Sequence, residues 1–464
     1  MSRLTVKHVH FVGIGGAGLS ALARVMLARG WVVSGSDRAA SPALPVLARA
    51  GASVHVGHSA HFVNGADVVV ISSAIPPDNP EVVAAQARSI PVLKRDRWLA
   101  EMTLGSQLVA VAGSHGKTTT TAMIALLLYD AGLDPTAVIG GEVPQLGGNA
   151  IAGGSDLFVI EADEYDHAFL GLTPTIALVT NVEHDHPDLF EDVAAVRLAF
   201  ARFLDQVRSD GLIVAMGDDA DLRTLVRAPA RASACFYGFA AANDWQAAAL
   251  KPNDHGGTDF VALKAGEPVG AIRLRVPGRH NVLNALGATA VADALDVPMA
   301  AIQTSLARFT GAKRRFQPVG TVGRIQIFDD YAHHPSEVRA TLEAARQRFG
   351  ERPIWVVFQP HTFSRLRALL DGFATAFSEA NRLIVSDIYA ARETDTLGVS
   401  AEDLIERVRA GGVPVSYIPT QEEILQELIA TLPKDVIVMT LGAGDITSLG
   451  PHLRRLLEGR QDEE

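Results

Sequence analysis

A chain of 464 residues is too long for a single hydrophobic core and predicts about three domains. Its formal net charge of −11 argues against a nucleic-acid-binding protein and provides no basic face for an anionic membrane. The single cysteine, Cys235, excludes an internal disulfide and a cysteine-based metal cluster. With no apolar leader and no run of membrane-spanning length, the sequence predicts a soluble cytoplasmic protein.

Residues 1–104 predict a first α/β unit with a phosphate-binding loop. Residues 9–12 form an apolar strand, residues 13–18 (GIGGAG) follow at once, and a helical segment comes next. A second strand ends at Asp37, so G-x-G-x-x-G stands with an acidic residue about twenty positions on. This pattern specifies a diphosphate at a helix end and a ribose hydroxyl on Asp37, which suits a UDP-sugar as well as NAD. A turn-forming role for Asp37 is the alternative.

Residues 105–312 predict a second unit built on a nucleotide-triphosphate loop. An apolar strand leads into the turn at 113–116 (GSHG), and Lys117 and Thr118 open a strongly helical segment. Backbone N–H groups and a positive helix end then converge on one spot, where Lys117 meets the β- and γ-phosphates and the Thr118 hydroxyl binds Mg²⁺. The fit to G-x-x-x-x-G-K-[ST] is imperfect, because Val111 occupies the place of the first glycine. A glycine turn before an ordinary helix is the alternative.

Two apolar strands of this second unit end in polar clusters. Residues 157–160 lead into EADEYD at 161–166, and residues 176–180 lead into NVEHDH at 181–186. In a parallel sheet both clusters lie beside the triphosphate loop, where carboxylates and imidazoles can hold Mg²⁺. The two histidines also fit a second divalent ion. Helix capping or a solvated loop is the alternative interpretation of the acidic residues.

A helix that starts near residue 278 carries two asparagines in its first turn. Asn281 and Asn284 are three positions apart and share one face, which suits contact with an adenine edge. Capping alone explains Asn281 nearly as well. Residues 311–316 then predict a linker whose arginines reach across onto phosphates.

Residues 313–464 predict a third unit in which strands and helices alternate. The indicated strands are residues 324–328, 354–358, 383–385 and 436–441. With amphipathic helices between them, they make a doubly wound α/β sheet. Polar residues follow these strands, among them DDYAHHP from Asp329, and such clusters favour a cleft at that edge. Histidines beside a proline also occur in ordinary surface loops.

Several motifs, in order along the whole chain, resemble those of the Mur ligases. They are GIGGAG at 13–18, GSHGKTTT at 113–120, EADEYD at 161–166, TNVEHDH at 180–186, HNVLNA at 280–285, DDYAHHPSE at 329–337 and FQPHTFSR at 358–365. The resemblance implies an N-terminal Rossmann-like domain for a UDP-sugar (1–104), a central P-loop ATPase domain (105–312) and a C-terminal Rossmann-like domain for an amino acid (313–464). It implies ATP-dependent joining of L-alanine to the lactyl carboxylate of UDP-N-acetylmuramate, through an acyl phosphate, in peptidoglycan precursor synthesis.

The resemblance also implies roles for individual residues. The implied catalytic residues are Lys117, His186, His333 and Arg365. The implied ATP contacts are Gly113, Ser114, His115, Gly116, Lys117, Thr118, Thr119, Asn281, Asn284, Arg315 and Asp330. The implied UDP-sugar contacts are Gly15, Gly16, Ala17, Gly18, Asp37, Ser72, Ser73 and Ala74. The amino acid is assigned to Tyr331, His333 and Arg365, and Mg²⁺ to Thr118, Glu161 and His186. We expect a monomer or weak homodimer.

Three positions depart from the family pattern. The central unit lacks the lysine that related enzymes carbamylate near the second metal, which leaves that site to His186 with Glu183 or His184. Tyr165 stands where many members have serine. Thr362 stands where some members have arginine, so one anion contact is missing or replaced.

Three other functions compete with this interpretation. A peptide-recycling ligase of the same family attaches a whole peptide to the same carboxylate, but its first loop usually carries bulkier residues than GIGGAGLS. A nicotinamide-dependent dehydrogenase leaves Lys117, Glu161 and His186 without a role. A non-catalytic nucleotide sensor does not need the polar strand ends of the third unit.

Overall fold

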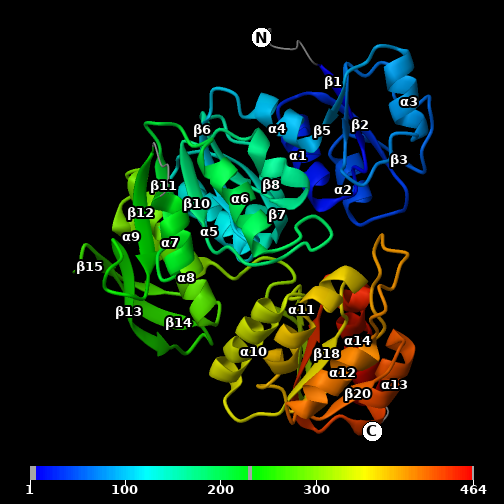
Figure 1. Cartoon of the computed structure of the whole chain (residues 1–464), viewed down its shortest axis with the longest axis vertical. Helices are drawn as coiled ribbons and strands as arrows, with labels where there is room; N and C mark the ends of the chain where they lie inside the picture. Colours follow the sequence, from blue (N-terminus) through cyan, green and yellow to red (C-terminus); the bar gives the residue numbers. More distant parts are fainter. Residues whose placement is uncertain (1–6, 228–231, 462–464) are drawn as a thin grey trace.

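The computed structural model describes residues 7–227 and 232–461. Three sheets follow one another along the chain, and Figure 1 shows the N-terminal and C-terminal sheets at opposite ends of the view with the middle sheet beside them. None of the helices in the two described ranges is long and apolar enough to cross a membrane. The predicted α/β class is confirmed.

The first sheet has five parallel strands in the order β3-β2-β1-β4-β5. They are β1 (His8–Val12), β2 (Val32–Asp37), β3 (Ser53–Val56), β4 (Val68–Ile71) and β5 (Val92–Lys94). Its helices are α1 (Ala17–Ala28), α2 (Ala43–Arg49), α3 (Pro80–Ala87) and α4 (Arg95–Met102). Apolar residues of β1 and β4 are buried on both faces, which is why these strands are continuous apolar runs. The strand order reverses between β1 and β4, so the loops after both strands open onto one crevice.

The middle sheet has ten strands in the order β15-β14-β13-β12-β11-β10-β6-β9-β7-β8. They are β6 (Gln107–Ala112), β7 (Thr136–Val143), β8 (Gly148–Ile151), β9 (Leu157–Glu161), β10 (Ile176–Val179), β11 (Leu212–Met216), β12 (Ser233–Gly238), β13 (Trp245–Pro252), β14 (Thr258–Lys264) and β15 (Glu267–Arg273). Its helices are α5 (Lys117–Asp130), α6 (Val193–Leu204), α7 (Ala220–Arg227), α8 (Arg279–Ala294) and α9 (Met299–Arg308), with 3-10 turns η1 (Pro144–Leu146) and η2 (Tyr165–Gly171). Of these strands, only β6, β9 and β10 are predicted from the sequence.

Helix α5 explains how the middle sheet holds the predicted triphosphate loop. It is buried from Thr118 to Leu128, because it lies between the sheet and helices α8 and α9. A helix that is apolar on all sides is a core helix rather than a surface one. Its N-terminus, which carries Lys117, is therefore fixed relative to the sheet.

The third sheet has six strands in the order β16-β17-β21-β18-β19-β20, parallel except for the edge strand β16. They are β16 (Gln317–Val322), β17 (Arg324–Asp330), β18 (Ile354–Phe358), β19 (Arg382–Val385), β20 (Val415–Tyr417) and β21 (Asp435–Leu441). Its helices are α10 (Pro335–Phe349), α11 (Phe363–Ala376), α12 (Ala401–Ala410), α13 (Gln421–Thr431) and α14 (Leu449–Gln461), with the 3-10 turn η3 (Asp445–Ser448). All four strands that the sequence predicts here are present.

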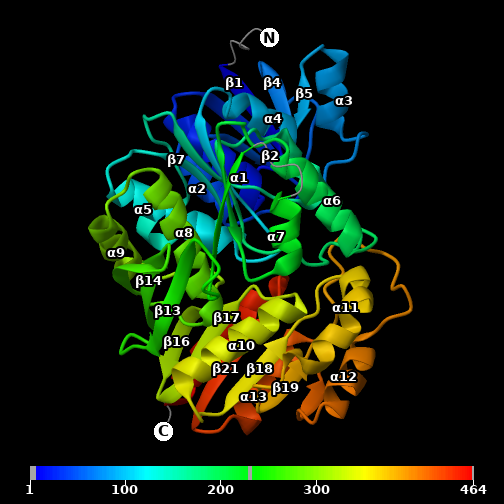
Figure 2. The ribbon, with the colours of Figure 1, turned by 60° about the vertical axis from the view of Figure 1, so that its left-hand side comes forward.

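The three sheets meet where their loops carry polar residues. Figure 2 shows helix α10 and strand β17 of the third sheet directly below the middle sheet. The start of α10 touches the loops after β6 and β10: His334 Nε2 lies 3.2 Å from the carbonyl oxygen of His184, and Glu337 lies 3.4 Å from His115. Loops from far-apart segments therefore converge on one region.

Candidate active site

A cavity of about 200 Å³ lies between the loops of the middle sheet and the C-terminal sheet. The residues predicted for ATP that line it are His115, Gly116, Thr119, Asn281, Asn284, Arg315 and Asp330. They come from the loop after β6, from α5, from α8, from the linker before β16 and from the end of β17. The structure therefore brings together residues that lie more than two hundred positions apart in the sequence.

The triphosphate loop has the predicted strand, turn and helix. Gly113 has a φ of +139° and lies so close to Thr180 that an added Cβ would stand 1.9 Å from the Thr180 hydroxyl. Gly116, with a φ of +81°, is the N-cap of α5. Asn181 fixes the turn, because its side-chain oxygen accepts a hydrogen bond from the His115 N–H at 2.9 Å. Glycine is required at both turn positions because other residues rarely adopt these conformations.

Lys117 folds back over this turn and forms a buried ion pair. Its ammonium donates to the carbonyl oxygen of Gly113 at 2.7 Å and lies 2.7 Å from the Glu164 carboxylate. Burial lowers the pKa of Lys117, but the charge of Glu164 outweighs it and the net shift is upward. Lys117 is therefore a fixed cation at the helix N-terminus. Glu164 is missing from the predicted site residues, although its place in the acidic cluster after β9 was the available signal.

Thr118 and Glu161 form a candidate Mg²⁺ site. The Thr118 hydroxyl donates to Glu161 Oε1 at 3.0 Å, and the Gly140 N–H donates to Glu161 Oε2 at 2.7 Å. Burial raises the pKa of Glu161, so this carboxylate lacks enough positive charge around it. A hydroxyl and a carboxylate are oxygen donors of the kind that Mg²⁺ prefers, and the residues therefore fit the ion.

His186 lies beside the Lys117 pair. Its Nε2 is 3.8 Å from Glu164 Oε1 and 3.8 Å from Asp185 Oδ2. His186 has a left-handed backbone conformation with φ of +55°, which costs about 1–3 kcal/mol for a residue other than glycine. Such strain is often found at functional sites. The metal role predicted for His186 stays a prediction.

The two asparagines of α8 lie on one face, as their spacing predicts. The Asn281 amide donates to the carbonyl oxygen of Pro277 at 2.7 Å, and the Asn284 amide donates to Asn281 Oδ1 at 3.2 Å. Both side chains line the cavity. His280 also lines it, and burial lowers its pKa to about 4, so the ring is neutral. His280 was part of the recognised motif but not a predicted site residue.

The end of β17 supplies charged groups from the third sheet. Burial raises the pKa of Asp330 to about 6, although the carboxylate accepts N–H groups of Phe316 at 2.6 Å and Ala332 at 2.8 Å. Glu337 connects the two sides of the cavity, because Oε1 lies 3.4 Å from both His115 and Arg315. Glu337 is not among the predicted site residues. Its signal was the capping box at the start of α10, where it is the N3 residue.

A second cavity, of about 380 Å³, lies at the glycine-rich loop of the first sheet. The predicted UDP-sugar residues that line it are Gly16, Ala17, Gly18, Ser72 and Ser73. Other lining residues are Arg95, at the start of α4 beside the first sheet, and Asp163, Tyr165, Tyr331 and Arg392, from loops of the middle and third sheets. Arg95 and Asp163 form an ion pair of 2.7 Å there. Arg95 and Arg392 belong to no recognised motif, so no sequence pattern points to them.

Gly15, Asp37 and Ala74 do not line this second cavity. Asp37 instead supports the loop, because its Oδ2 accepts the Gly15 N–H at 2.9 Å. The Ala74 N–H donates to Ser72 Oγ at 3.3 Å. The ribose role predicted for Asp37 therefore remains a prediction, beside an observed role in holding the glycine-rich loop.

The predicted amino-acid residues lie at the third sheet's edge. His333 Nδ1 lies 2.9 Å from the carbonyl oxygen of Tyr331, and burial lowers the pKa of His333 to about 3. Arg365 is only 4% exposed, and its Nε donates to Asp185 Oδ1 at 2.9 Å. The arginine thus already has a carboxylate partner from the middle sheet. Thr362, at the position of the departure, accepts the Arg365 N–H as N-cap of α11.

Family models match this chain over nearly its whole length. The Mur ligase family, catalytic domain, matches residues 8–107; the Mur ligase middle domain matches residues 111–292; and the Mur ligase, glutamate ligase domain, matches residues 314–444. The chain belongs to the Mur ligase family.

Relatives of this Mur ligase match its sequence over nearly their full length. A UDP-N-acetylmuramate–L-alanine ligase of Frankia casuarinae is 48% identical over 494 residues, covering 98% of each chain. One of Symbiobacterium thermophilum is 45% identical over 465 residues, covering 98% of this chain and 96% of its own. The crystal structure of the UDP-N-acetylmuramate–alanine ligase of Thermotoga maritima has a TM-score of 0.83 at 28% identity and covers 98% of this chain and all of its own.

These comparisons confirm the family and the three-part α/β ligase fold that the motifs predicted. The domain boundaries of this Mur ligase, placed after residues 104 and 312, stay predictions, as do the roles of individual residues. The family is ATP-dependent, which agrees with a triphosphate loop whose glycine turns and helix N-terminus are preserved in the structure.

Proposed function

We propose that this Mur ligase joins L-alanine to the lactyl carboxylate of UDP-N-acetylmuramate and forms ADP, phosphate and UDP-N-acetylmuramoyl-L-alanine. The reaction is a step of peptidoglycan precursor synthesis. Support comes from relatives of that name that match the chain from end to end. A peptide-recycling ligase of the same family remains the second candidate.

The observation that carries this proposal is that two consecutive residues at the end of β17 line the two cavities. Asp330 lines the cavity of the triphosphate loop, and its neighbour Tyr331 lines the cavity of the glycine-rich loop. A nucleotide in the first and a sugar acid in the second would thus bring their reacting groups to one place. Such positioning supplies much of the rate enhancement in phosphoryl transfer.

We assign the substrates by domain. Residues 1–104 hold the UDP-sugar, residues 105–312 hold ATP, and residues 313–464 hold L-alanine. The proposed sugar contacts are the cavity-lining residues Gly16, Ala17, Gly18, Ser72 and Ser73. Asp37 then acts by fixing the loop as well as by meeting the ribose.

The chemistry has two steps. A carboxylate is a poor electrophile, so the γ-phosphoryl group of ATP first passes to a carboxylate oxygen of the sugar acid, and ADP leaves. The alanine amine then attacks the carbonyl carbon, the C–O bond to phosphate breaks, and the amine loses a proton. Lys117 stabilises the negative charge that gathers on the phosphoryl oxygens, because it stays protonated in its buried position.

Bound Mg²⁺ would neutralise the phosphate charge, and Thr118 and Glu161 would hold it. His333 has a defined part in the second step. If its Nδ1–H donates to the Tyr331 carbonyl at 2.9 Å, Nε2 carries a lone pair. The neutral ring then accepts a hydrogen bond from the alanine amine without repelling it. Arg365 would meet the alanine carboxylate by sharing its guanidinium between that group and Asp185.

We further propose a cytoplasmic enzyme that acts as a monomer or weak homodimer, with small-molecule substrates and neither nucleic acid nor membrane as partner. The net charge of −11 is in keeping with the absence of a polyanion partner.

Isotope transfer tests the proposal. UDP-N-acetylmuramate labelled with oxygen-18 in its carboxylate is incubated with ATP, Mg²⁺ and L-alanine, and the released phosphate is analysed by mass spectrometry. We expect label in the phosphate and phosphate release only with both acceptors present. Label-free phosphate would contradict the acyl-phosphate route, and faster turnover with the peptide in place of L-alanine would select the recycling ligase.

A further inference from the structure

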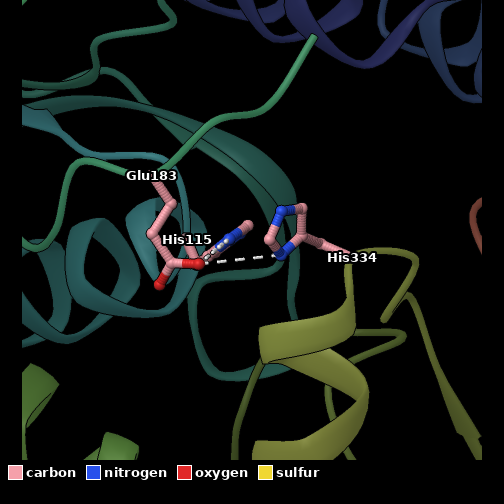
Figure 3. A group of neighbouring side chains, drawn as sticks. All are labelled: His115, Glu183 and His334. Carbon is pink, nitrogen blue, oxygen red and sulfur yellow. Dashed lines mark ion pairs between the residues drawn. The ribbon is translucent and has the colours of Figure 1, made fainter. Parts of the chain in front are cut away.

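Three side chains from separate segments converge beside the nucleotide cavity, and we name them the His–Glu–His cluster: His115, Glu183 and His334. His115 is in the triphosphate loop, Glu183 follows β10, and His334 is the N-cap of α10 in the third sheet's domain (Figure 3). Glu183 Oε2 lies 3.6 Å from His115 Nε2 and 3.8 Å from His334 Nδ1. One ligand atom from each residue lies within 4.8 Å of the other two.

These separations suit a shared cation better than direct hydrogen bonds. A nitrogen and an oxygen 3.6–3.8 Å apart are beyond hydrogen-bond distance. Ligand bonds of about 2.0–2.2 Å place the donors of a tetrahedral zinc ion about 3.4 Å from one another. His115 Nε2 is buried and has no hydrogen-bond partner among the residues that the structure describes. A buried nitrogen without a partner is costly unless something else satisfies it.

The outer nitrogens of both imidazoles are oriented as in metal sites. His115 Nδ1 lies 3.4 Å from the Glu337 carboxylate, and His334 Nε2 lies 3.2 Å from the carbonyl oxygen of His184. Metal-binding histidines usually give their second N–H to a carboxylate or a backbone carbonyl, which turns the other nitrogen toward the ion. His334 Nδ1 now accepts the Ser336 N–H at 3.2 Å, and Glu183 Oε2 accepts the Ser336 hydroxyl. A metal would replace the first of these bonds and share the carboxylate with the second.

We propose that the His–Glu–His cluster binds a divalent transition metal of the zinc class, at a site separate from the Mg²⁺ site of Thr118 and Glu161. Two imidazoles and one carboxylate favour zinc over magnesium, which prefers oxygen ligands only. The Glu337 carboxylate lies 3.4 Å from His115, so a second carboxylate adds negative charge beside the cluster. Water or a nucleotide phosphate oxygen would complete the coordination.

The position of the cluster gives such a metal a consequence. His115 and Glu183 belong to the middle domain, whereas His334 belongs to the C-terminal domain. A bound ion would therefore tie the two domains together across the nucleotide cavity. Zinc-class ions would therefore slow a catalytic cycle in which the two domains have to separate. Added magnesium would not restore the rate.

Zinc binding to the full-length protein tests the site. The protein, without nucleotide or substrates and with excess Mg²⁺, is titrated with Zn²⁺ against a chromophoric chelator. We expect one tight equivalent, and we expect His334→Asn to weaken it by about 100-fold or more, since outer-sphere changes alone cost 10–100-fold. Asparagine preserves helix capping, so α10 keeps its N-cap. His452→Asn, at an exposed position of α14, is the matched control and should leave binding unchanged.

The outcomes decide between sites. Absence of a tight equivalent, or unchanged binding in both His334→Asn and Glu183→Gln, would overturn the proposal. Loss of the equivalent in Glu161→Gln alone would place zinc in the Mg²⁺ site and also overturn it. Glu183→Gln keeps the side-chain shape and guards against misfolding of the histidine variant. Because no substrate is present, the result is independent of the ligase function proposed above.

Discussion

The first and third domains of this Mur ligase meet the middle domain through chemically different surfaces. On the first side, helix α1 packs against β7 and β8, and one apolar cluster continues from Val9 and Leu22 into Val138 and Phe169 of the middle domain. On the third side, the apolar clusters contain only residues from Phe316 onward. The contacts across that side are polar, as in the ion pair between Arg365 and Asp185 at 2.8 Å.

This difference indicates which domain moves. Burial of apolar surface contributes about 25 cal/mol per Å², and water does not replace it, so we expect the first and middle domains to move as one rigid unit. Hydrogen bonds and ion pairs can be exchanged for water or for ligand groups at small net cost. We therefore expect the C-terminal domain to be the part that opens and closes.

The largest effect should come from breaking the buried ion pair of the polar interface. Asp185→Asn leaves the Arg365 guanidinium buried without its counter-charge, which costs about 3–5 kcal/mol. We expect the C-terminal domain to swing away, with a larger radius of gyration in X-ray scattering. The matched control is Asp221→Asn, which removes a partner of Arg197 from a pair whose side chains are 40% and 65% exposed and should change little. An unchanged radius of gyration in Asp185→Asn would argue that this ion pair does not hold the C-terminal domain in place.

Lys117→Ala should affect the chemical step without changing either domain interface. Loss of one fixed positive group at the phosphates should lower phosphate release by about 10²–10³-fold, or roughly 3–4 kcal/mol. Binding of the UDP-sugar, which we assign to the first domain, should stay nearly unchanged in calorimetry. Equal loss of both would contradict the assignment of ATP and sugar to different domains.

Leu22→Ala tests the apolar interface. This residue of α1 is 1% exposed in the shared cluster, and truncation of such a leucine costs about 3 kcal/mol. Hydrogen exchange should rise in the first and middle domains together, with the C-terminal domain unaffected. Leu22→Met conserves volume and should cost less than about 1.5 kcal/mol. Exchange that rises in residues 7–104 alone would show that the two domains are not one unit.

The polar interface should also respond to pH. The pKa of His115 rises from 6.5 to about 10, so its contribution is complete below pH 6.5 and is lost as pH climbs toward 10. The pKa of Glu183 falls from 4.5 to about 2, so its contribution is present above pH 4.5 and is lost as pH falls toward 2. We expect hydrogen exchange at the start of α10 to increase from pH 7 to pH 9 after correction for intrinsic rates. His115→Gln should abolish that increase.

Asp37→Ala should have the smallest effect, and that effect should be confined to the ligand of the first domain. It removes the acceptor of the Gly15 N–H and the predicted ribose contact. The KM for the UDP-sugar should rise about tenfold, equivalent to about 1.4 kcal/mol, while that for ATP changes little. Asp78→Ala, in an exposed loop of the same domain, is the control. Equal rises in both KM values would remove the ribose role.

The sequence predicts those elements that have a short, local pattern of their own. Strands β6, β9 and β10 are apolar runs followed by motif residues, and all were predicted close to their observed bounds. The hairpin of β14 and β15 was missed, although Ala265 and Gly266 both have positive φ, as a two-residue turn requires. An alanine at the first turn position hides that signal. Strands β7 and β8 depend on packing against α1, which no local pattern reveals.

By itself, the sequence determined the family, the order of the phosphate-binding loops and the presence of polar strand ends, because these depend on short motifs whose spacing is fixed by backbone geometry. The tertiary structure alone decided the pairings: Lys117 with Glu164, Glu337 with His115, and Arg365 with Asp185. Each pair joins groups that are distant along the chain, and their partners follow only from how the three sheets are placed. The tertiary structure also decides which interface is apolar and which is polar.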